Sequence, residues 1–242
     1  MEIRSLHFSL DKTAGAWYSM VERSDRTERK NAMRAFIYTG GAICPENITE
    51  HPKADELRIA ADSGYRNAKR LGERVDILVG DFDSLGEVPR DEGLEIHQVP
   101  AEKSLTDTQI ALELAVERGA DEVILVGGLS GRLDHTLSTL YILEDMKERG
   151  IHGYLTDGQS RVHYIRSSSI LIARSAYKYL SVIAADEQVK GVSVEGGKYP
   201  LKNQTLRQRL QYAVSNEITG NVAMISCKKG GLFIIESRDV TP

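Results

Sequence analysis

The sequence of 242 residues is poor in cysteine, carries no excess of positive charge and contains no long apolar run. The two cysteines, Cys44 and Cys227, are far apart and lack metal-site spacing, so we expect reduced thiols and a cytoplasmic location. No run of about 18 apolar residues exists to span a membrane, and the N-terminus lacks the apolar core of a signal peptide. The net charge of -4 argues against nucleic acid or an anionic membrane as a partner.

The composition is that of a soluble globular protein, with 41% hydrophobic and 27% charged residues. The length suits one large domain or two modest ones. Residues 1–32 fit poorly with the remainder, because segments such as 22–30 are charged and show no periodicity. We therefore expect residues 1–32 to form a poorly ordered extension.

From residue 33 to about residue 150, apolar strand patterns alternate with helical patterns. This alternation predicts an α/β domain with a mainly parallel, doubly wound sheet. The predicted strands are 35–38, 57–61, 77–79, 94–99 and 122–126, and the predicted helices are 65–71, 106–118 and a last helix that runs to about residue 149. In that last helix Leu133, Leu137, Leu140 and Leu143 recur at steps of three and four, which predicts one packed face.

Residues 151–242 have a different character. Short β-rich segments are separated there by turn residues such as Gly196–Gly197 and Gly230–Gly231, and no long helical pattern is present. The second part of the chain is therefore predicted to be an all-β domain of the sandwich type. We find no internal repeat and no low-complexity tract.

The most informative stretch follows the short apolar run 77–79. The run predicts a buried strand that ends at Gly80 and is followed by Asp81 and Asp83. In an extended backbone the two carboxylates share one side and Phe82 turns to the other. Paired carboxylates at a strand tip suit Mg²⁺, which completes its shell with water and substrate phosphates. The alternative is an ordinary acidic surface turn.

Three further aspartates are expected at the same edge of the sheet. Asp62 directly follows a predicted strand, Asp107 begins a helix, and Asp134 follows a glycine-rich loop. Ligands of open α/β sheets bind beyond the carboxyl ends of the strands, and clustered carboxylates repel unless cations neutralise them. Each aspartate also has a plain structural interpretation: a turn at Asp62, a capping box around Asp107, and a helix cap at Asp134.

The glycine-rich segment 127–131 has the features of a phosphate-binding loop. Gly128 and its neighbours allow close backbone approach, a helix N-terminus follows, and Arg132 can contact phosphate oxygens. The segment matches neither a Walker A loop nor a dinucleotide-binding fingerprint. Lys103 is either a phosphate ligand or a solvated loop lysine. His135 is more typical of a structural residue than of a general base, and no serine has a histidine partner at a recognised spacing.

Taken together, these motifs resemble the thiamine pyrophosphokinase family. Five of them occur in the order found in that family, over about residues 35–237. They are Asp62-Ser63-Gly64, Gly80-Asp81-Phe82-Asp83-Ser84, Lys103-Ser104-Leu105-Thr106-Asp107, Gly128-Leu129-Ser130-Gly131-Arg132-Leu133-Asp134-His135 and Ser215-Asn216. Ser63, Ser104 and Ser130 depart from the family pattern, and the second departure puts the number of metal ions in question.

The resemblance implies an α/β domain that holds ATP and Mg²⁺, a β-sandwich domain, and a homodimer with thiamine bound between subunits. By that analogy Asp81, Asp83 and Asp107 bind metal and polyphosphate, with Gln109 assisting. The remaining expected ligands of the nucleotide and of thiamine are Asp62, Lys103, Gly128, Arg132, Asp134, Ser215 and Asn216.

The implied reaction is transfer of the pyrophosphoryl group of Mg-ATP to the hydroxyl of thiamine, with release of AMP. One alternative is a pyrophosphokinase for a pterin-like alcohol. A second is a nucleotide-binding regulatory protein that does not consume ATP. A metal-dependent glycosyltransferase would account for the Asp81 and Asp83 pair but would leave the other motifs unexplained.

Overall fold

The computed structural model describes residues 33–239 except for positions 84, 87, 101 and 103. The predicted extension, residues 1–32, lies outside the described residues. No helix in the described part of the chain is long and apolar enough to cross a bilayer.

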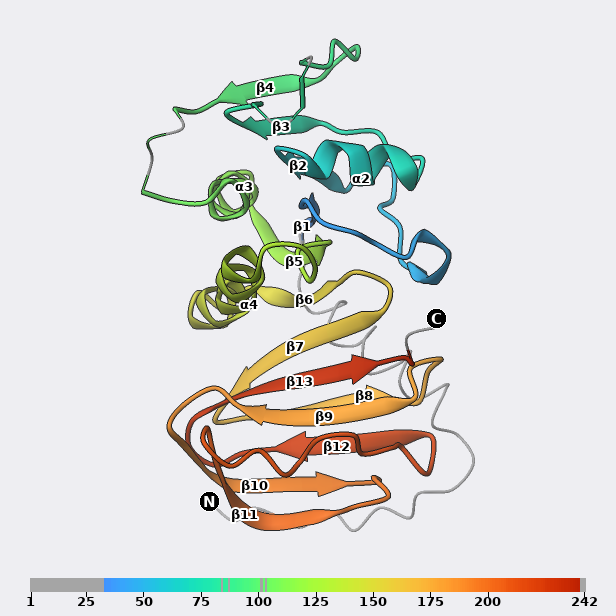
Figure 1. Cartoon of the computed structure of the whole chain (residues 1–242), viewed down its shortest axis with the longest axis vertical. Helices are drawn as coiled ribbons and strands as arrows, with labels where there is room; N and C mark the ends of the chain where they lie inside the picture. Colours follow the sequence, from blue (N-terminus) through green and yellow to red (C-terminus); the bar gives the residue numbers. More distant parts are fainter. Residues whose placement is uncertain (1–32, 84, 87, 101, 103, 240–242) are drawn as a thin grey trace.

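A nine-stranded sheet runs from the upper end of the molecule, at β4, into its lower half, at β9 (Figure 1). Its order is β4-β3-β2-β1-β5-β6-β7-β13-β9, and neighbouring strands are parallel from β4 to β6 and antiparallel from β6 to β9. The strands are β1 (Met33–Tyr38), β2 (Leu57–Ala61), β3 (Ile77–Gly80), β4 (Glu95–Gln98), β5 (Ala120–Val126), β6 (His152–Thr156), β7 (Ser160–Arg166), β9 (Tyr179–Ala184) and β13 (Gly231–Ser237).

Helices cover both faces of the parallel part, as the predicted doubly wound arrangement requires. Helices α3 (Asp107–Glu117) and α4 (Leu133–Glu148) lie on one face and α2 (Gly64–Arg70) on the other (Figure 1). The central strands β1 and β2 are buried on both sides, which explains their nearly continuous apolar sequences. Two apolar cores, one under α3 and α4 and one under α2, hold the parallel part together.

Helix α4 packs with a different face from the one that the leucine spacing predicts. Leu143 is buried and Leu140 packs partly against the core, but Leu133 and Leu137 are 70% and 48% exposed. The buried residues of the helix are Thr139, Ile142, Leu143 and Met146. The prediction of one packed face was therefore wrong for the first two turns of the helix.

The second part of the chain is a β-sandwich, as predicted. A four-stranded sheet of order β11-β10-β12-β8 packs against β7, β13 and β9, and the core between them includes Ile165, Val192 and Ile234. Its strands are β8 (Ser169–Ala173), β10 (Gln188–Glu195), β11 (Leu201–Arg207) and β12 (Val222–Ser226). Because β6 pairs with both β5 and β7, one sheet is shared by the α/β part and the sandwich. A domain boundary after residue 150 remains a proposal.

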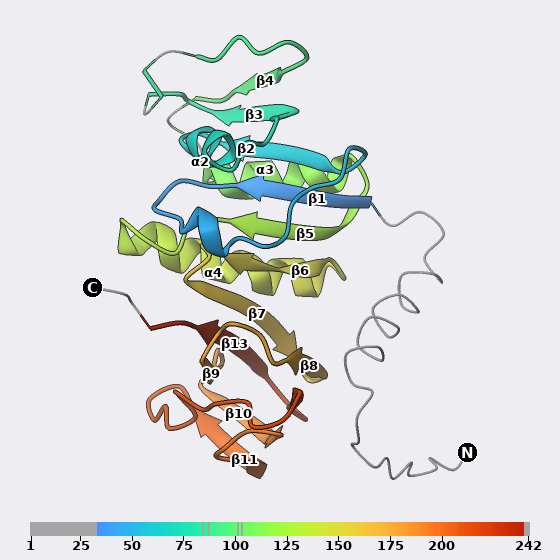
Figure 2. The same ribbon diagram turned by 90° about the vertical axis from the view of Figure 1, so that its right-hand side faces the viewer.

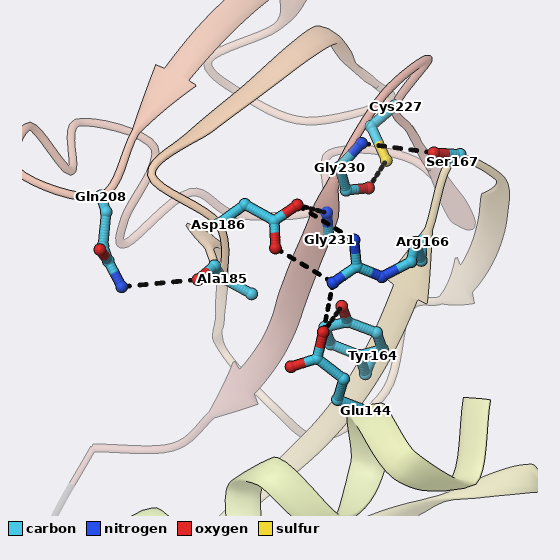
Figure 3. A network of polar contacts seen from close by, with 10 residues as sticks. All are labelled: Glu144, Tyr164, Arg166, Ser167, Ala185, Asp186, Gln208, Cys227, Gly230 and Gly231. Atoms are coloured by element: carbon cyan, nitrogen blue, oxygen red, sulfur yellow. Dashed lines mark hydrogen bonds and ion pairs between the residues drawn. The ribbon is translucent and has the colours of Figure 1, made fainter. Parts of the chain in front are cut away.

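Arg166 at the end of β7 connects α4 to the sandwich (Figure 3). Its guanidinium donates to Glu144 of α4 and makes two bonds of 3.1 Å to Asp186, which lies between β9 and β10. Tyr164 also donates to Glu144, at 2.9 Å, and the backbone N–H of Gly231 donates to Asp186 at 3.1 Å. This network holds α4 against the sandwich through charged hydrogen bonds.

Replacing Arg166 with methionine should lower the free energy of unfolding by about 1–2 kcal/mol. Two carboxylates, Glu144 and Asp186, would then face each other without their shared cation, although the 35% exposure of the Arg166 side chain allows solvent screening. Urea unfolding of the Arg166→Met variant measures the loss. Arg74→Met is the control, because Arg74 makes an ion pair at a 68% exposed position and should change stability by less than about 0.5 kcal/mol. Equal stability of the two variants would contradict the connecting role of Arg166.

Candidate active site

The candidate site is formed by loops at the carboxyl edge of the parallel strands. The arrowheads of β1 and β5 point to this edge in Figure 2, and the parallel strands β2, next to β1, and β3, next to β2, end there too. Four loop segments meet the edge: residues 39–42 after β1, 62–63 after β2, 81–83 after β3 and 127–132 after β5. This is the edge at which open α/β sheets bind their ligands.

Asp62, Asp81 and Asp83 form an acidic cluster at this edge. One carboxylate oxygen of each lies within 4.8 Å of the others. Asp62 and Phe82 both adopt left-handed backbone conformations, with φ of 47° and 66°. Phe82 is buried in the core under α2, so the chain turns around it and both neighbouring aspartates point to the rim. Asp81 and Asp83 thus lie side by side as expected. The cause is a turn at Phe82, whereas an extended backbone was expected from the sequence.

The acidic cluster has the chemistry of a site for a hard divalent cation. Three carboxylates at this spacing repel one another, and a cation removes the repulsion while taking oxygen ligands. Within the described ranges this is the one group of three or more such side chains close enough to share an ion. Asp107, the first residue of α3, is not in the group, so its role as a metal ligand stays a prediction.

The capping box expected around Asp107 is present. Thr106 caps α3 by accepting a bond of 3.3 Å from the backbone N–H of Gln109, and the Gln109 side chain accepts one of 2.9 Å from the Thr106 N–H. The side-chain oxygen of Gln109 is therefore hydrogen-bonded at the start of the helix. The assisting role of Gln109 at the metal stays a prediction. Lys103 lies outside the described residues.

Glycines let the loops after β1 and β5 pack backbone against backbone. A Cβ on Gly127 would lie 2.6 Å from the carbonyl oxygen of Thr39, and a Cβ on Gly128 would lie 2.8 Å from the Thr39 hydroxyl. Both residues have positive φ, 101° and 76°, and the Gly128 N–H donates to the carbonyl of Gly40 at 2.8 Å. The glycine pair is therefore required by the contact with the β1 loop, whether or not phosphate binds there.

A comparison of Gly128→Ala with Gly131→Ala separates this contact from backbone strain. Both glycines have positive φ, but a Cβ on Gly131 meets nothing within 4 Å. We expect Gly131→Ala to cost about 1 kcal/mol of stability, from strain alone, and Gly128→Ala to cost roughly 2–4 kcal/mol because its Cβ also collides with the side chains of Thr39 and Thr139. Thermal and urea unfolding of the two variants measure the difference. Equal losses would show that the contact with Thr39 does not constrain position 128.

Arg132 and Asp134 lie together at the start of α4. The guanidinium donates to the carboxylate at 2.6 Å, and this hydrogen bond holds the pKa of Asp134 below its usual value. Both side chains are exposed, at 73% and 62%, so a bound anion can reach the arginine. Asp134 also accepts a bond of 3.0 Å from the backbone N–H of His135. It is the second residue of α4, whose N-cap is Arg132 without a side-chain capping bond, so the helix cap considered at Asp134 from the sequence is not found.

Ser215 and Asn216 lie in the sandwich and not beside the acidic cluster. Their segment pairs with β9, at the opposite end of the shared sheet from β3 (Figure 1). Asn216 is buried, and its side chain bonds the backbone of Tyr199 in both directions, at 2.9 Å and 2.8 Å. Ser215 is exposed and has a left-handed φ of 55°. Asn216 thus has a structural role in a turn, and thiamine binding by this pair remains a prediction.

One residue of the site region was missed from the sequence. Asn67 in α2 is only 4% exposed and donates to the carbonyls of Thr39 and Gly41 at 2.8 Å and 2.9 Å. It fixes the loop after β1 from the side of α2. Asparagine is a poor residue for a helix interior, and its place directly after the Asp62 turn was the available signal.

Comparisons with known proteins agree on one family. The family model "Thiamin pyrophosphokinase, catalytic domain" matches residues 49–155, and "Thiamin pyrophosphokinase, vitamin B1 binding domain" matches residues 167–232. The chain is 31% identical to a thiamine pyrophosphokinase of Bacillus subtilis, over 84% of this chain and 98% of that protein. A thiamin pyrophosphokinase of Caenorhabditis elegans is 24% identical over 79% and 82% of the two chains.

Solved structures of this family also have the same fold as this chain. A crystal structure of thiamine pyrophosphokinase from Bacillus subtilis superposes with a TM-score of 0.75 at 26% identity, covering 86% of this chain and all (100%) of that one. The enzyme from Geobacillus thermodenitrificans gives 0.74 at 28% identity, covering 86% and 99%. The two-domain architecture and the family resemblance are thereby confirmed, and the chain belongs to the thiamine pyrophosphokinase family.

Proposed function

We propose that the chain transfers the pyrophosphoryl group of ATP to the hydroxyl of thiamine, giving thiamine diphosphate and AMP. The observation that supports this most is the cluster of Asp62, Asp81 and Asp83 at the carboxyl edge of the sheet, in a chain of this family. Phosphoryl and pyrophosphoryl transfer depend mainly on positioning and on stabilising charge on phosphate oxygens. A cation-binding cluster beside a glycine-rich loop and an exposed arginine provides both.

Mg²⁺ is the cation that this donor set suits, and Asp62, Asp81 and Asp83 would hold it. When bound, the metal offsets negative charge on the polyphosphate as AMP leaves. Asp107 is proposed to contribute a further carboxylate from the start of α3. Gly128, Arg132 and Lys103 are proposed to contact the polyphosphate, through backbone N–H groups at the glycine and side-chain cations at the other two.

In the proposed reaction the hydroxyl oxygen of thiamine attacks the β-phosphorus of ATP. The new P–O bond forms as the bond between the β-phosphorus and the oxygen of the α-phosphate breaks, and that oxygen leaves with AMP. An aspartate, either Asp83 or Asp107, accepts the proton of the hydroxyl or orients it. In this arrangement the protein itself forms no covalent intermediate.

A homodimer with the active site between subunits is proposed from the placement of the exposed residues. The acidic cluster and Ser215 lie toward opposite ends of the shared sheet, so one chain does not bring them together. Leu133, Leu137 and Tyr141 are exposed at steps of four along α4, starting beside Arg132. A second exposed apolar group near Ser215 consists of Tyr199, Leu210, Tyr212 and Val214. Contact between these surfaces in two copies would bury both and bring thiamine ligands to the metal site.

An acceptor comparison tests the proposed function. Purified protein is incubated with Mg-ATP and either thiamine, a pterin-like alcohol or no acceptor, and nucleotides and products are separated by chromatography. AMP formation that depends on thiamine supports the proposal. AMP formation that depends on the pterin identifies the other acceptor class, and tight ATP binding without consumption identifies a regulatory protein. A cytoplasmic location remains part of the proposal.

A further inference from the structure

The loops after β1 and β5 flank the crevice that is expected where the strand order of the sheet reverses. The chain passes from β1 to its neighbour β2, whereas β5 lies on the other side of β1. Ligands of open α/β sheets bind at such a reversal, outside the carboxyl ends of the strands. The crevice is therefore bounded by residues 39–42 on the β1 side and by 127–131 on the β5 side.

Ser130 joins the two sides of this crevice. Its hydroxyl accepts a hydrogen bond of 2.6 Å from the backbone N–H of Ala42 and donates one of 3.3 Å to the carbonyl of the same residue. The approach depends on Gly41, because a Cβ there would lie 2.8 Å from the Ser130 hydroxyl oxygen. A single side chain thus satisfies both backbone polar groups of Ala42 across the crevice.

Both loops have anchoring contacts, and the β5 loop is fixed at its start, where the N–H groups of Gly127 and Gly128 donate to the carbonyls of Thr156 and Gly40 at 2.8 Å each. The β1 loop is tied to α2 by the buried Asn67, which bonds two of its carbonyls. The β5 loop has positive φ at Gly127, Gly128 and Gly131, and glycine backbones lose the most freedom when they are ordered. Ser130 lies between Gly128 and Gly131, and its hydroxyl bonds to the β1 loop, so it adds a second connection between the loops beyond the Gly128–Gly40 bond.

We infer that Ser130 is a positioning residue, which holds the loop 127–131 in its ligand-binding arrangement before the nucleotide arrives. This rests on the proposed function, in which that loop contacts the polyphosphate of ATP. A loop that is already ordered loses less entropy on binding than a free one. In this role Ser130 does not contact the reacting atoms, so it stabilises the bound ground state and the transition state equally. Loss of its hydroxyl should therefore weaken ATP binding and leave kcat unchanged.

The test measures the binding of Mg-ATP by isothermal titration calorimetry, without thiamine, in the full-length protein. Ser130→Ala removes only the hydroxyl, and we expect ATP to bind about three- to tenfold more weakly, as for the loss of one ordering hydrogen bond. Ser138→Ala, on a half-buried serine of α4, is the matched control and should bind within about twofold of wild type. Ser130→Thr retains the hydroxyl and should restore most of the affinity.

Two further measurements distinguish a positioning role of Ser130 from a general loss of structure. Proton exchange at the amide of Ala42 should become faster in Ser130→Ala and not in Ser138→Ala. In the thiamine assay KM for ATP should rise with kcat unchanged. Faster exchange at Ala42 with unchanged ATP affinity would overturn the inference, as would a fall in kcat at constant KM. A wild-type protein that binds ATP but makes no thiamine diphosphate would refute the proposed function and still allow the calorimetric comparison.

Discussion

Replacing Asp83 with asparagine is expected to lower the rate of thiamine diphosphate formation by roughly 100- to 1000-fold. The amide keeps the shape of the side chain but removes one of three negative charges that lie within 4.8 Å of one another. A cation bound by the cluster would then be held less firmly and would offset less of the charge on the departing AMP. Steady-state product formation at saturating Mg-ATP and thiamine measures the loss.

The fold should survive this change. Asp83 is exposed at the rim, and removing one of three repelling carboxylates should leave the metal-free protein at least as stable as wild type. Asp55→Asn is the matched control, because Asp55 is an exposed aspartate that precedes β2 and lies outside the cluster. The control should retain nearly full activity. Near-normal turnover of Asp83→Asn would contradict the role of the cluster, and a similar loss in Asp55→Asn would show that the effect is not specific.

Mixing two inactive variants should restore activity if the active site is shared between subunits. Asp83→Asn disables the acidic cluster, and Ser215→Arg places bulk and positive charge where the cationic thiamine is proposed to bind. In a mixed dimer one site carries both changes and the other carries neither. Since half of randomly assembled dimers are mixed, activity should recover to about a quarter of the wild-type value, at least 25-fold above that of Asp83→Asn alone.

The controls for the mixing experiment use the same two variants. Each variant alone, at the same total concentration, should stay nearly inactive. Ser215→Arg should retain its fold, because Ser215 is exposed and only its backbone N–H makes a described bond, to Ser181. Mixed dimers are isolated by two different affinity tags. Isolated mixed dimers without activity would contradict a site composed of both subunits, and full activity of Ser215→Arg alone would remove this segment from the thiamine site.

The sequence was sufficient to predict where the acidic residues lie but not how they meet. Strand patterns placed Asp62 and Asp81 at the carboxyl ends of two strands, which holds, and the structure shows that these strands are neighbours. The left-handed conformation of Phe82 could not be predicted, because it accompanies the packing of this side chain in the core and a bulky aromatic residue rarely adopts it by local preference. Asp62 joins the cluster directly, although the family resemblance placed it near the nucleotide.

The existence of helix α4 was predicted correctly, but the packed face was predicted only in part. A repeat at three and four residues shows that a helix has an apolar face, and it does not show whether this chain or another covers that face. Leu133 and Leu137 belong to the repeat and remain exposed, whereas Met146 lies outside the leucine series and is buried. The sharing of one sheet by both parts of the chain was also not predicted, although β6 and β7 are joined only by residues 157–159 and pair as a local hairpin.

The most direct test of the whole account is the stoichiometry of the reaction. Purified protein, Mg-ATP and thiamine are incubated, and AMP, ADP, thiamine monophosphate and thiamine diphosphate are quantified by chromatography over time. Pyrophosphoryl transfer predicts equal amounts of AMP and thiamine diphosphate from the first time point, with no ADP and no AMP when thiamine is omitted. Accumulation of ADP with thiamine monophosphate, or release of AMP independent of thiamine, would contradict it.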